Sequence, residues 1–361
     1  MHRIVNAYYL QEEATRALRR GEPPHTVDEV FRKARILGAT IVRTNAYNGA
    51  AEKRGDSAIR WAPKLTDEVA WRGLDLVLER ATHHGVRLVL VLGNQWDELG
   101  GARTFVSWAQ LPNPKQADAR FFTHPSVIEF YEAHVDETLS RVSTVDGLRY
   151  ASHPAVAGWE VLNEARGQGL ERSGHTMRDW TDRIARRVRK QITTDAWIGS
   201  GEEGFDVSLE GRDATFWLRT RARWIFRTRS SFTLHARSPF LNVASIHLYP
   251  EDWGVRSNLV EEAGTRFIRE SARIARVHQK PLFVGEMGVR NDGKIPLETR
   301  RQIIRTWLHV AQEEGAWGAG AWMLSYDTRP MHWDAYQFYV RDGLPIDASA
   351  NGVAPAYLDD A

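Results

Sequence analysis

The chain has 361 residues, of which 26% are charged and 42% hydrophobic, which excludes a disordered or collagen-like protein. Its 48 basic and 46 acidic residues leave a net charge of +2, so we expect no general attraction to nucleic acid. The absence of cysteine excludes disulfides, thiolate catalysis and cysteine-based metal sites. No run of 18 uncharged apolar residues occurs, so we expect no membrane span.

Short β-like runs alternate with amphipathic helical stretches along the chain. The predicted strands are residues 4–9, 40–44, 86–92, 156–162, 196–199, 243–248, 281–285 and 316–324. The predicted helices are residues 27–37, 67–84, 126–141, 177–191, 259–278 and 297–314, the first two capped by Thr26 and Thr66. Alternation implies parallel strands with right-handed crossovers, and eight such units close into an α/β fold of the (β/α)8 TIM barrel type. A doubly wound open sheet is the alternative, although no glycine-rich phosphate motif follows the first strand.

The barrel is expected to form one catalytic domain over residues 1–361, because no linker or change of composition divides the chain. From about residue 340 the sequence predicts an irregular tail, and an eighth helix has little support. The run from Arg212 to Arg237 is rich in arginine interleaved with aromatic residues, which favours an amphipathic helix with a solvated face. A nucleic-acid site on this run is the alternative.

Polar and aromatic residues collect at one end of nearly every predicted strand. In a barrel the carboxyl ends of the strands build the active site. The residues at or just after these ends are Arg43, Asn94, Trp96, Glu160, Asn163, Glu164, Glu202, Glu203, His247, Tyr249, Glu286 and Trp322. Core packing does not require this distribution, so the sequence indicates a site at this end of the barrel.

Glu164 and Glu286 end strands that lie across the barrel mouth from each other. Two such carboxylates can approach to about 5–5.5 Å, the separation of a retaining glycosidase pair. One would attack the anomeric carbon, and the other would protonate the leaving oxygen and later activate water. Tyr249 is the candidate to hold the nucleophile, and Asn163 to bond the sugar 2-hydroxyl. A metal site is disfavoured, because no HExxH-type spacing occurs.

Several segments together resemble a known family. They include 6–10, 41–44, 94–96, 100–101, 106–108, 158–166 (GWEVLNEAR), 201–205, 247–254 (HLYPEDWG), 283–288 (FVGEMG) and 321–322. The chain resembles glycoside hydrolase family 5, of the clan of retaining (β/α)8 glycosidases, and within it the endo-β-1,4-mannanases. The resemblance extends from about Asn6 to Tyr339. Ala165 stands where the family usually has proline, Met323 where it usually has glutamine, and residues 206–240 match poorly.

The resemblance implies a role for each matching residue. It implies Glu164 as acid/base and Glu286 as nucleophile. It places five residues around the sugar ring before the cleaved bond, namely Arg43, Asn163, His247, Tyr249 and Trp322. It carries five more to neighbouring sugar positions, namely Trp96, Trp108, Arg166, Glu203 and Trp253.

The sequence therefore predicts a retaining enzyme that cleaves β-1,4-mannosidic bonds of mannan or manno-oligosaccharides without metal or cofactor. An exo-acting β-mannosidase, a β-1,4-glucan hydrolase and a non-catalytic carbohydrate-binding barrel are the alternatives. We expect no nucleic-acid or membrane partner, and the oligomeric state stays open. Residues 1–6 lack the apolar core of a signal peptide, so we expect a secreted enzyme whose leader is absent from this chain, or a cytoplasmic one.

Overall fold

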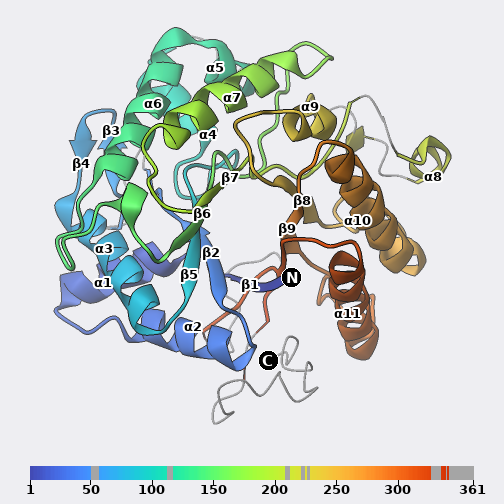
Figure 1. Cartoon of the computed structure of the whole chain (residues 1–361), viewed down its shortest axis with the longest axis horizontal. Helices are drawn as coiled ribbons and strands as arrows, with labels where there is room; N and C mark the ends of the chain where they lie inside the picture. The colour runs from blue at the N-terminus through green and yellow to red at the C-terminus, as the bar shows by residue number, and fades with distance from the viewer. Residues whose placement is uncertain are drawn as a thin grey trace.

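The computed structural model describes residues 1–49, 57–111, 117–207, 212–220, 224–225, 228–326, 335–338 and 340. Eight parallel strands form one sheet in the order β7-β6-β5-β2-β1-β10-β9-β8, surrounded by helices (Figure 1). The strands are β1(His2–Asn6), β2(Ile41–Asn45), β5(Arg87–Val91), β6(Val156–Glu160), β7(Trp197–Gly199), β8(Ala244–Leu248), β9(Leu282–Met287) and β10(Gly318–Ala321). Just before β8, the Asn242 backbone N–H donates to the carbonyl of Ile198 on β7 at 2.7 Å. The sheet is thus a nearly closed barrel, as the sequence predicts.

The barrel interior has an apolar layer and a polar layer. The apolar layer takes one residue from each of six strands and a seventh from the position just before β8, namely Ile4, Ile41, Val89, Ala157, Trp197, Phe283 and Val243. Residues nearer the carboxyl ends, such as Asn6, Arg43, Glu160 and Ser245, are buried and polar. The outward-facing strand residues belong to a second core that extends from Val5 to Val340. Burial on both faces explains the near-continuous apolar runs of the strands.

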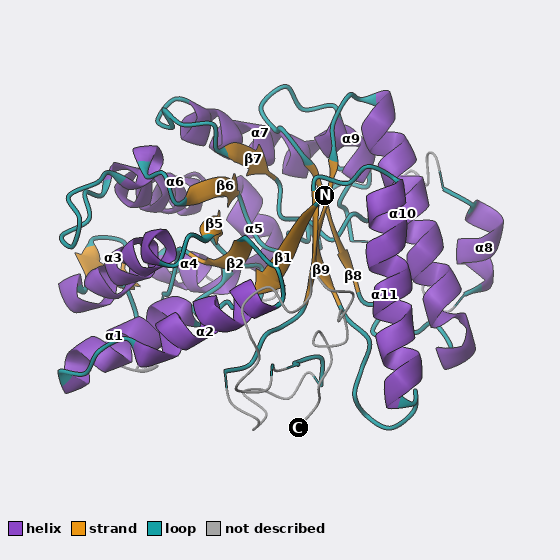
Figure 2. Ribbon diagram, turned by 60° about the horizontal axis from the view of Figure 1, so that its bottom comes forward, coloured by secondary structure: helices purple, strands orange, loops and turns teal. Residues whose placement is uncertain are grey.

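The helices form the outer layer (Figure 2). They are α1(Leu10–Arg20), α2(His25–Ile36), α3(Glu68–His83), α4(Ala102–Trp108), α5(Ala117–Thr123), α6(Pro125–Ser140), α7(His175–Arg189), α8(Ala214–Arg219), α9(Phe232–Ala236), α10(Val260–Val277) and α11(Leu297–Glu313). A hairpin of β3(Arg60–Ala62) and β4(Leu65–Thr66) and 3-10 turns at Tyr150–Ser152 and Ser257–Leu259 complete the described elements. Within the described residues, no helix is both long and apolar enough to cross a membrane.

Two predicted helix caps are wrong. Helix α2 starts at His25, so Thr26 lies inside it, and Thr66 ends strand β4. Asp67 caps α3, because its carboxylate accepts hydrogen bonds from the backbone N–H groups of Val69 at 2.8 Å and Ala70 at 3.1 Å. Carboxylate and hydroxyl side chains both cap helices well, so the sequence could not rank two adjacent candidates.

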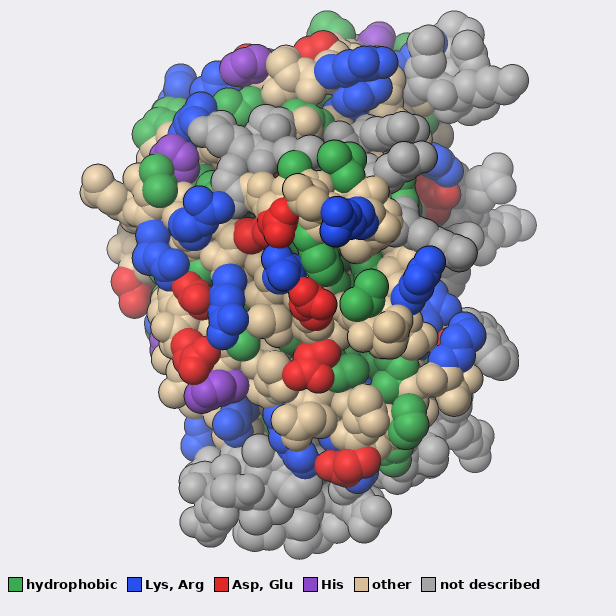
Figure 3. All heavy atoms as spheres, turned by 90° about the vertical axis from the view of Figure 1, so that its right-hand side faces the viewer, with side chains coloured by type: hydrophobic (Ala, Val, Ile, Leu, Met, Phe, Trp, Pro, Cys, Tyr) green, Lys and Arg blue, Asp and Glu red, His purple; other side chains and the backbone are tan. Residues whose placement is uncertain are grey.

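The arginine-rich run is not one solvated helix. It contains the short helices α8 and α9, and the side chain of Arg212 is fully buried. Arg212 donates to the carbonyl of Gly204 at 2.6 Å and stacks on Phe267 at 4.4 Å. Basic and acidic side chains are interspersed on the face that carries α8, α10 and α11 (Figure 3). The predicted irregular tail beyond residue 340 lies outside the described residues.

Candidate active site

A cavity of about 700 Å³ opens at the carboxyl ends of the strands. The sequence-predicted residues that line it are Arg43, Asn94, Trp96, Asn163, Glu164, Arg166, Glu203, Tyr249, Trp253, Glu286 and Trp322. The sequence did not single out Tyr8, Trp224 or Tyr336, which also line it. The size and the mixture of aromatic and charged walls suit a short stretch of polysaccharide.

Two glutamates converge in this cavity. Glu286 lies within β9, and Glu164 follows β6 at a backbone φ of 53°, a left-handed conformation that is uncommon for glutamate. The Glu164 backbone N–H donates to the carbonyl of Gly201 at 2.8 Å, which holds this turn in place. One carboxylate oxygen of each glutamate lies within 4.8 Å of the other and of the His247 imidazole. This close approach of the nearest oxygens is compatible with the about 5–5.5 Å between the carboxyl groups of a retaining pair.

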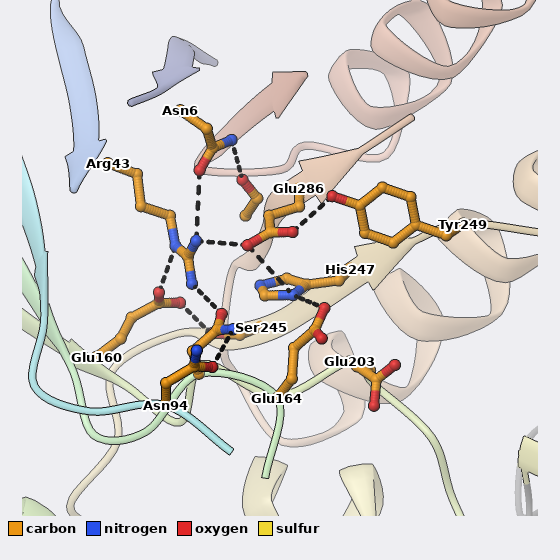
Figure 4. A network of polar contacts seen from close by, with 12 residues as sticks. Asn6, Arg43, Asn94, Glu160, Glu164, Glu203, Ser245, His247, Tyr249 and Glu286 are labelled. Carbon is orange, nitrogen blue, oxygen red and sulfur yellow. Dashed lines mark hydrogen bonds and ion pairs between the residues drawn. The ribbon is translucent and has the colours of Figure 1, made fainter. Parts of the chain in front are cut away.

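The Glu286 carboxylate is held at both oxygens (Figure 4). Nη1 of Arg43 donates to Oε1 at 2.6 Å, and the Tyr249 hydroxyl donates to Oε2 at 2.6 Å. Burial raises the pKa of Glu286, and the charges of His247 and Arg43 offset part of that rise. The two donors leave the carboxylate in one fixed orientation.

Glu164 is hydrogen-bonded to His247. Nδ1 of His247 donates to Oε1 of Glu164 at 2.7 Å, and the Trp96 indole N–H donates to Oε2 at 2.5 Å. Burial alone would raise the pKa of Glu164, but the hydrogen bond from His247 and the charges of His247 and Arg166 lower it. Burial would lower the pKa of His247, but the Glu286 charge and the hydrogen bond to Glu164 raise it. His247 itself is fully buried and is not among the residues that line the cavity.

Arg43 connects the polar layer of the barrel to the site. Its Nε donates to Glu160 at 2.6 Å. Its Nη1 donates to Glu286 at 2.6 Å and to the side-chain oxygen of Asn6 at 3.4 Å. Its Nη2 donates to Asn163 at 2.7 Å. Burial alone would lower the pKa of Arg43, but the charges of Glu160 and Glu286 raise it above its ordinary value. Arg43 therefore contacts four side chains at once.

A second charged pair lies beside Glu164. Arg166 donates to both carboxylate oxygens of Glu203, each at 2.7 Å, and its guanidinium lies 4.5 Å from the Trp96 ring and 5.3 Å from the Trp224 ring. Burial, and secondarily the Glu164 charge, raises the pKa of Glu203 to about 7. Trp96 remains 38% exposed, so it presents a ring face to the cavity. This arrangement forms an aromatic wall beside the candidate acid/base.

Aromatic side chains also line the cavity on the side of Glu286. Trp322 stacks on Tyr8, with ring centroids 5.7 Å apart and an angle of 12° between the rings. Tyr336 packs edge-on against Tyr249 at 4.9 Å. Stacking surfaces therefore flank the glutamate pair on two sides.

Two predicted sugar contacts lie mainly in the hydrophobic core. Trp108 packs against Phe105 at 4.9 Å and is not among the residues that line the cavity. Trp253 is 2% exposed and packs on Phe267, and its carbonyl accepts a hydrogen bond from the Trp224 indole. An aromatic residue near a strand end can face the core or the cavity, and the local pattern does not distinguish them.

Among the described residues, Glu164, His247 and Glu286 are close enough together to be considered as metal ligands. Their facing atoms already have other partners. Nδ1 of His247 is bonded to Glu164, and Arg43 and Tyr249 contact the two oxygens of Glu286. Because these atoms already make hydrogen bonds within the protein, we keep the expectation of a reaction without metal.

Comparisons with known proteins agree with this geometry. A family model described as glycoside hydrolase family 5 β-mannosidase-like matches residues 26–336. The chain is 29% identical over 330 residues to putative mannan endo-1,4-β-mannosidase 4 of Arabidopsis thaliana, with 88% of this chain and 76% of that protein covered. It is 30% identical over 384 residues to putative mannan endo-1,4-β-mannosidase 5 of Oryza sativa subsp. japonica, with 98% and 71% covered. Its fold matches an endo-1,4-β-D-mannanase from Thermotoga petrophila RKU-1 at a TM-score of 0.84 and 21% identity, covering 98% and 99% of the two chains.

Proposed function

The chain belongs to the glycoside hydrolase family 5 β-mannosidase-like family, and we propose that it hydrolyses β-1,4-mannosidic bonds by double displacement on Glu286 and Glu164. The observation that carries the mechanism is the approach of the two carboxylates to within 4.8 Å around one cavity. The two plant relatives are named as putative mannan endo-1,4-β-mannosidases, that is, as enzymes that cleave inside the polysaccharide. Their names support endo action for this protein as well.

In the first step a Glu286 oxygen attacks the anomeric carbon of the sugar. The bond from that carbon to the glycosidic oxygen breaks, and Glu164 gives its proton to the leaving oxygen. Arg43 and Tyr249 keep the nucleophile ionised and aimed. The product of this step is a sugar esterified to Glu286 and a free reducing-end fragment.

In the second step Glu164 takes a proton from water, whose oxygen attacks the anomeric carbon. The bond to Glu286 breaks and the sugar leaves with its original β configuration. The proton that Glu164 donates in the first step comes to it from Nδ1 of His247, which lies 2.7 Å from Oε1 of Glu164 in the free protein. A bound sugar beside Glu164 favours the neutral acid, because it removes water from the carboxylate.

The substrate we propose is polymeric β-mannan or long manno-oligosaccharides. Trp96 and Trp224 lie on the side of the acid/base, where the leaving fragment sits, and Trp322 lies on the side of the nucleophile. Stacking surfaces on both sides of the cleaved bond suit internal cleavage of a chain. Such a polymer lies outside cells, so we also propose that the enzyme acts there.

Azide rescue tests the two roles directly. With Glu164→Ala, hydrolysis of mannohexaose should fall about 10²–10⁴-fold. An aryl β-mannoside with a good leaving group should then give β-mannosyl azide, because azide replaces water in the second step. With Glu286→Ala, hydrolysis should be abolished, and any azide product should be the α anomer, because azide replaces the nucleophile.

Glu98→Ala is the matched control, because Glu98 lines the same cavity and is not one of the pair. It should keep the parental rate within a few-fold. Turnover of Glu286→Ala near the parental rate would refute the assigned nucleophile. Release of mannose alone from mannohexaose would replace endo action by exo action. Binding of mannan by the parental protein without any hydrolysis would favour a carbohydrate-binding barrel.

A further inference from the structure

Glu160 is a buried acid that the double displacement does not use. It is the last residue of β6, its side chain has no exposed surface, and it lies inside the polar layer of the barrel. Glutamate is almost never fully buried unless it is paired. Its partners are Nε of Arg43, which donates to Oε2 at 2.6 Å, and the Ser245 hydroxyl, which donates to Oε1 at 3.3 Å.

The guanidinium of Arg43 joins Glu160 to the nucleophile. Glu160 accepts a hydrogen bond from Nε of Arg43, and Glu286 accepts one from Nη1 of the same guanidinium (Figure 4). A guanidinium is planar and rigid, so fixing one edge fixes the direction of its other N–H groups. Removing the contact at Nε would free the group to rotate, and the hydrogen bond to Oε1 of Glu286 would lose its geometry.

The same connection divides the charge of Arg43. Two buried carboxylates share one guanidinium, so neither neutralises it alone. The other titratable groups that interact with Glu286 include His247 on β8, Tyr249 in the loop after it, Glu164 after β6 and Tyr47 after β2. When the contact at Nε is kept and only the charge of Glu160 is removed, as in Glu160→Gln, Arg43 would attract the Glu286 carboxylate more strongly and make it a weaker nucleophile.

We propose that Glu160 is a positioning residue for the first step, which holds Arg43 so that it aims the Glu286 carboxylate and neutralises it only in part. This inference rests on the proposed function, because it assigns Glu160 through the nucleophile. It adds Glu160 to the site as a residue that acts without touching the sugar.

The test compares Glu160→Gln with Glu160→Asp. Glu160→Gln keeps the shape and removes the charge. Its kcat should fall about 10–100-fold, with little change in KM, and the acidic limb of its kcat/KM profile should move to lower pH. Glu160→Asp keeps the charge but withdraws it by one methylene. Its acidic limb should stay in place, while kcat falls by less than in the glutamine variant.

Glu202→Gln is the matched control. Glu202 is also a buried glutamate, but it binds His235 at 2.9 Å and Ser230 at 3.0 Å and does not contact Arg43. This variant should lower the melting temperature without moving the acidic limb. The same measurements on each Glu160 variant include the melting temperature, so that a folding defect is separated from a change at the nucleophile.

Three results would overturn the inference. They are a parental kcat in Glu160→Gln, a fall in kcat with an unmoved acidic limb, or a parental kcat in Glu160→Asp if the glutamine variant does not fold. Failure of the proposed function looks different. In that case the parental protein itself would not hydrolyse any β-mannoside, whereas failure of this inference alone leaves parental and Glu286→Ala behaviour unchanged.

Discussion

Replacing Tyr249 by phenylalanine removes one hydroxyl from the site and little volume. That hydroxyl donates to Oε2 of Glu286 at 2.6 Å, while Arg43 continues to donate to Oε1. The tyrosine bond stabilises only the ionised carboxylate, because a protonated one needs no such donor at that oxygen. We therefore expect Tyr249→Phe to raise the pKa of Glu286.

The size of the effect follows from the kind of bond. A hydrogen bond to a charged, buried group contributes about 1.5–3 kcal/mol. Taking about 2 kcal/mol, and about 1.4 kcal/mol for each factor of ten, the ionised fraction of Glu286 falls about 30-fold on the acid side of the limb. Above the limb nearly all molecules are ionised in both proteins, so the difference there is smaller.

The assay is kcat/KM on mannohexaose as a function of pH, with the melting temperature as a control for folding. The ratio of parental to variant kcat/KM should be largest at low pH and decline as pH rises. A ratio that is the same at every pH would refute the idea that Tyr249 stabilises ionised Glu286. The shift is opposite in sign to that expected for Glu160→Gln, so the two variants check each other.

Two further predictions concern the whole site. The parental kcat/KM should follow a bell-shaped pH profile. Burial raises the pKa of Glu286 above its ordinary 4.5. The two carboxylates raise the pKa of His247, which is hydrogen-bonded to Glu164, above 6.5. Activity should therefore fall at low pH, with a midpoint above pH 4.5, and fall again at high pH, with a midpoint above pH 6.5. A flat profile from about pH 4 to 9 would contradict this. Trp224→Ala should raise KM for mannohexaose about 5–10-fold, the loss of about 1 kcal/mol of stacking, and leave an aryl β-mannoside almost unaffected; equal effects on both substrates would place Trp224 away from the leaving fragment.

Much of the fold could be read from local pattern. The run VRLVLV at 86–91 predicts a strand buried on both faces, and β5 occupies 87–91 of it. The predicted helices do not include α1, although Leu10, Ala14 and Ala17 form a buried stripe and Gly21 ends the helix in a left-handed conformation. The helix is mostly polar, and its only large apolar residues are Leu10 and Leu18, so the stripe is weak in the sequence.

The candidate site divides in the same way. Glu164 and Glu286 could be named because strand ends are recognisable in the sequence and parallel strands bring all such ends to one mouth. Trp224 could not, because it comes from the arginine-rich run and its place in the cavity wall depends on tertiary contacts with Arg166, Phe205 and the Trp253 carbonyl. Nothing in the local pattern distinguishes it from Trp217, which is fully buried.

By itself, the sequence determined the alternation of strands and helices and the end of the barrel where the polar residues gather, because hydrophobic periodicity and turn residues act over a few positions. Only the tertiary structure decided how those residues are paired. Arg43 lies between Glu160 and Glu286, which are 117 and 243 residues away along the chain. The choice among many possible partners depends on closure of the barrel, since contact geometry in a buried site is a property of the whole assembly of strands.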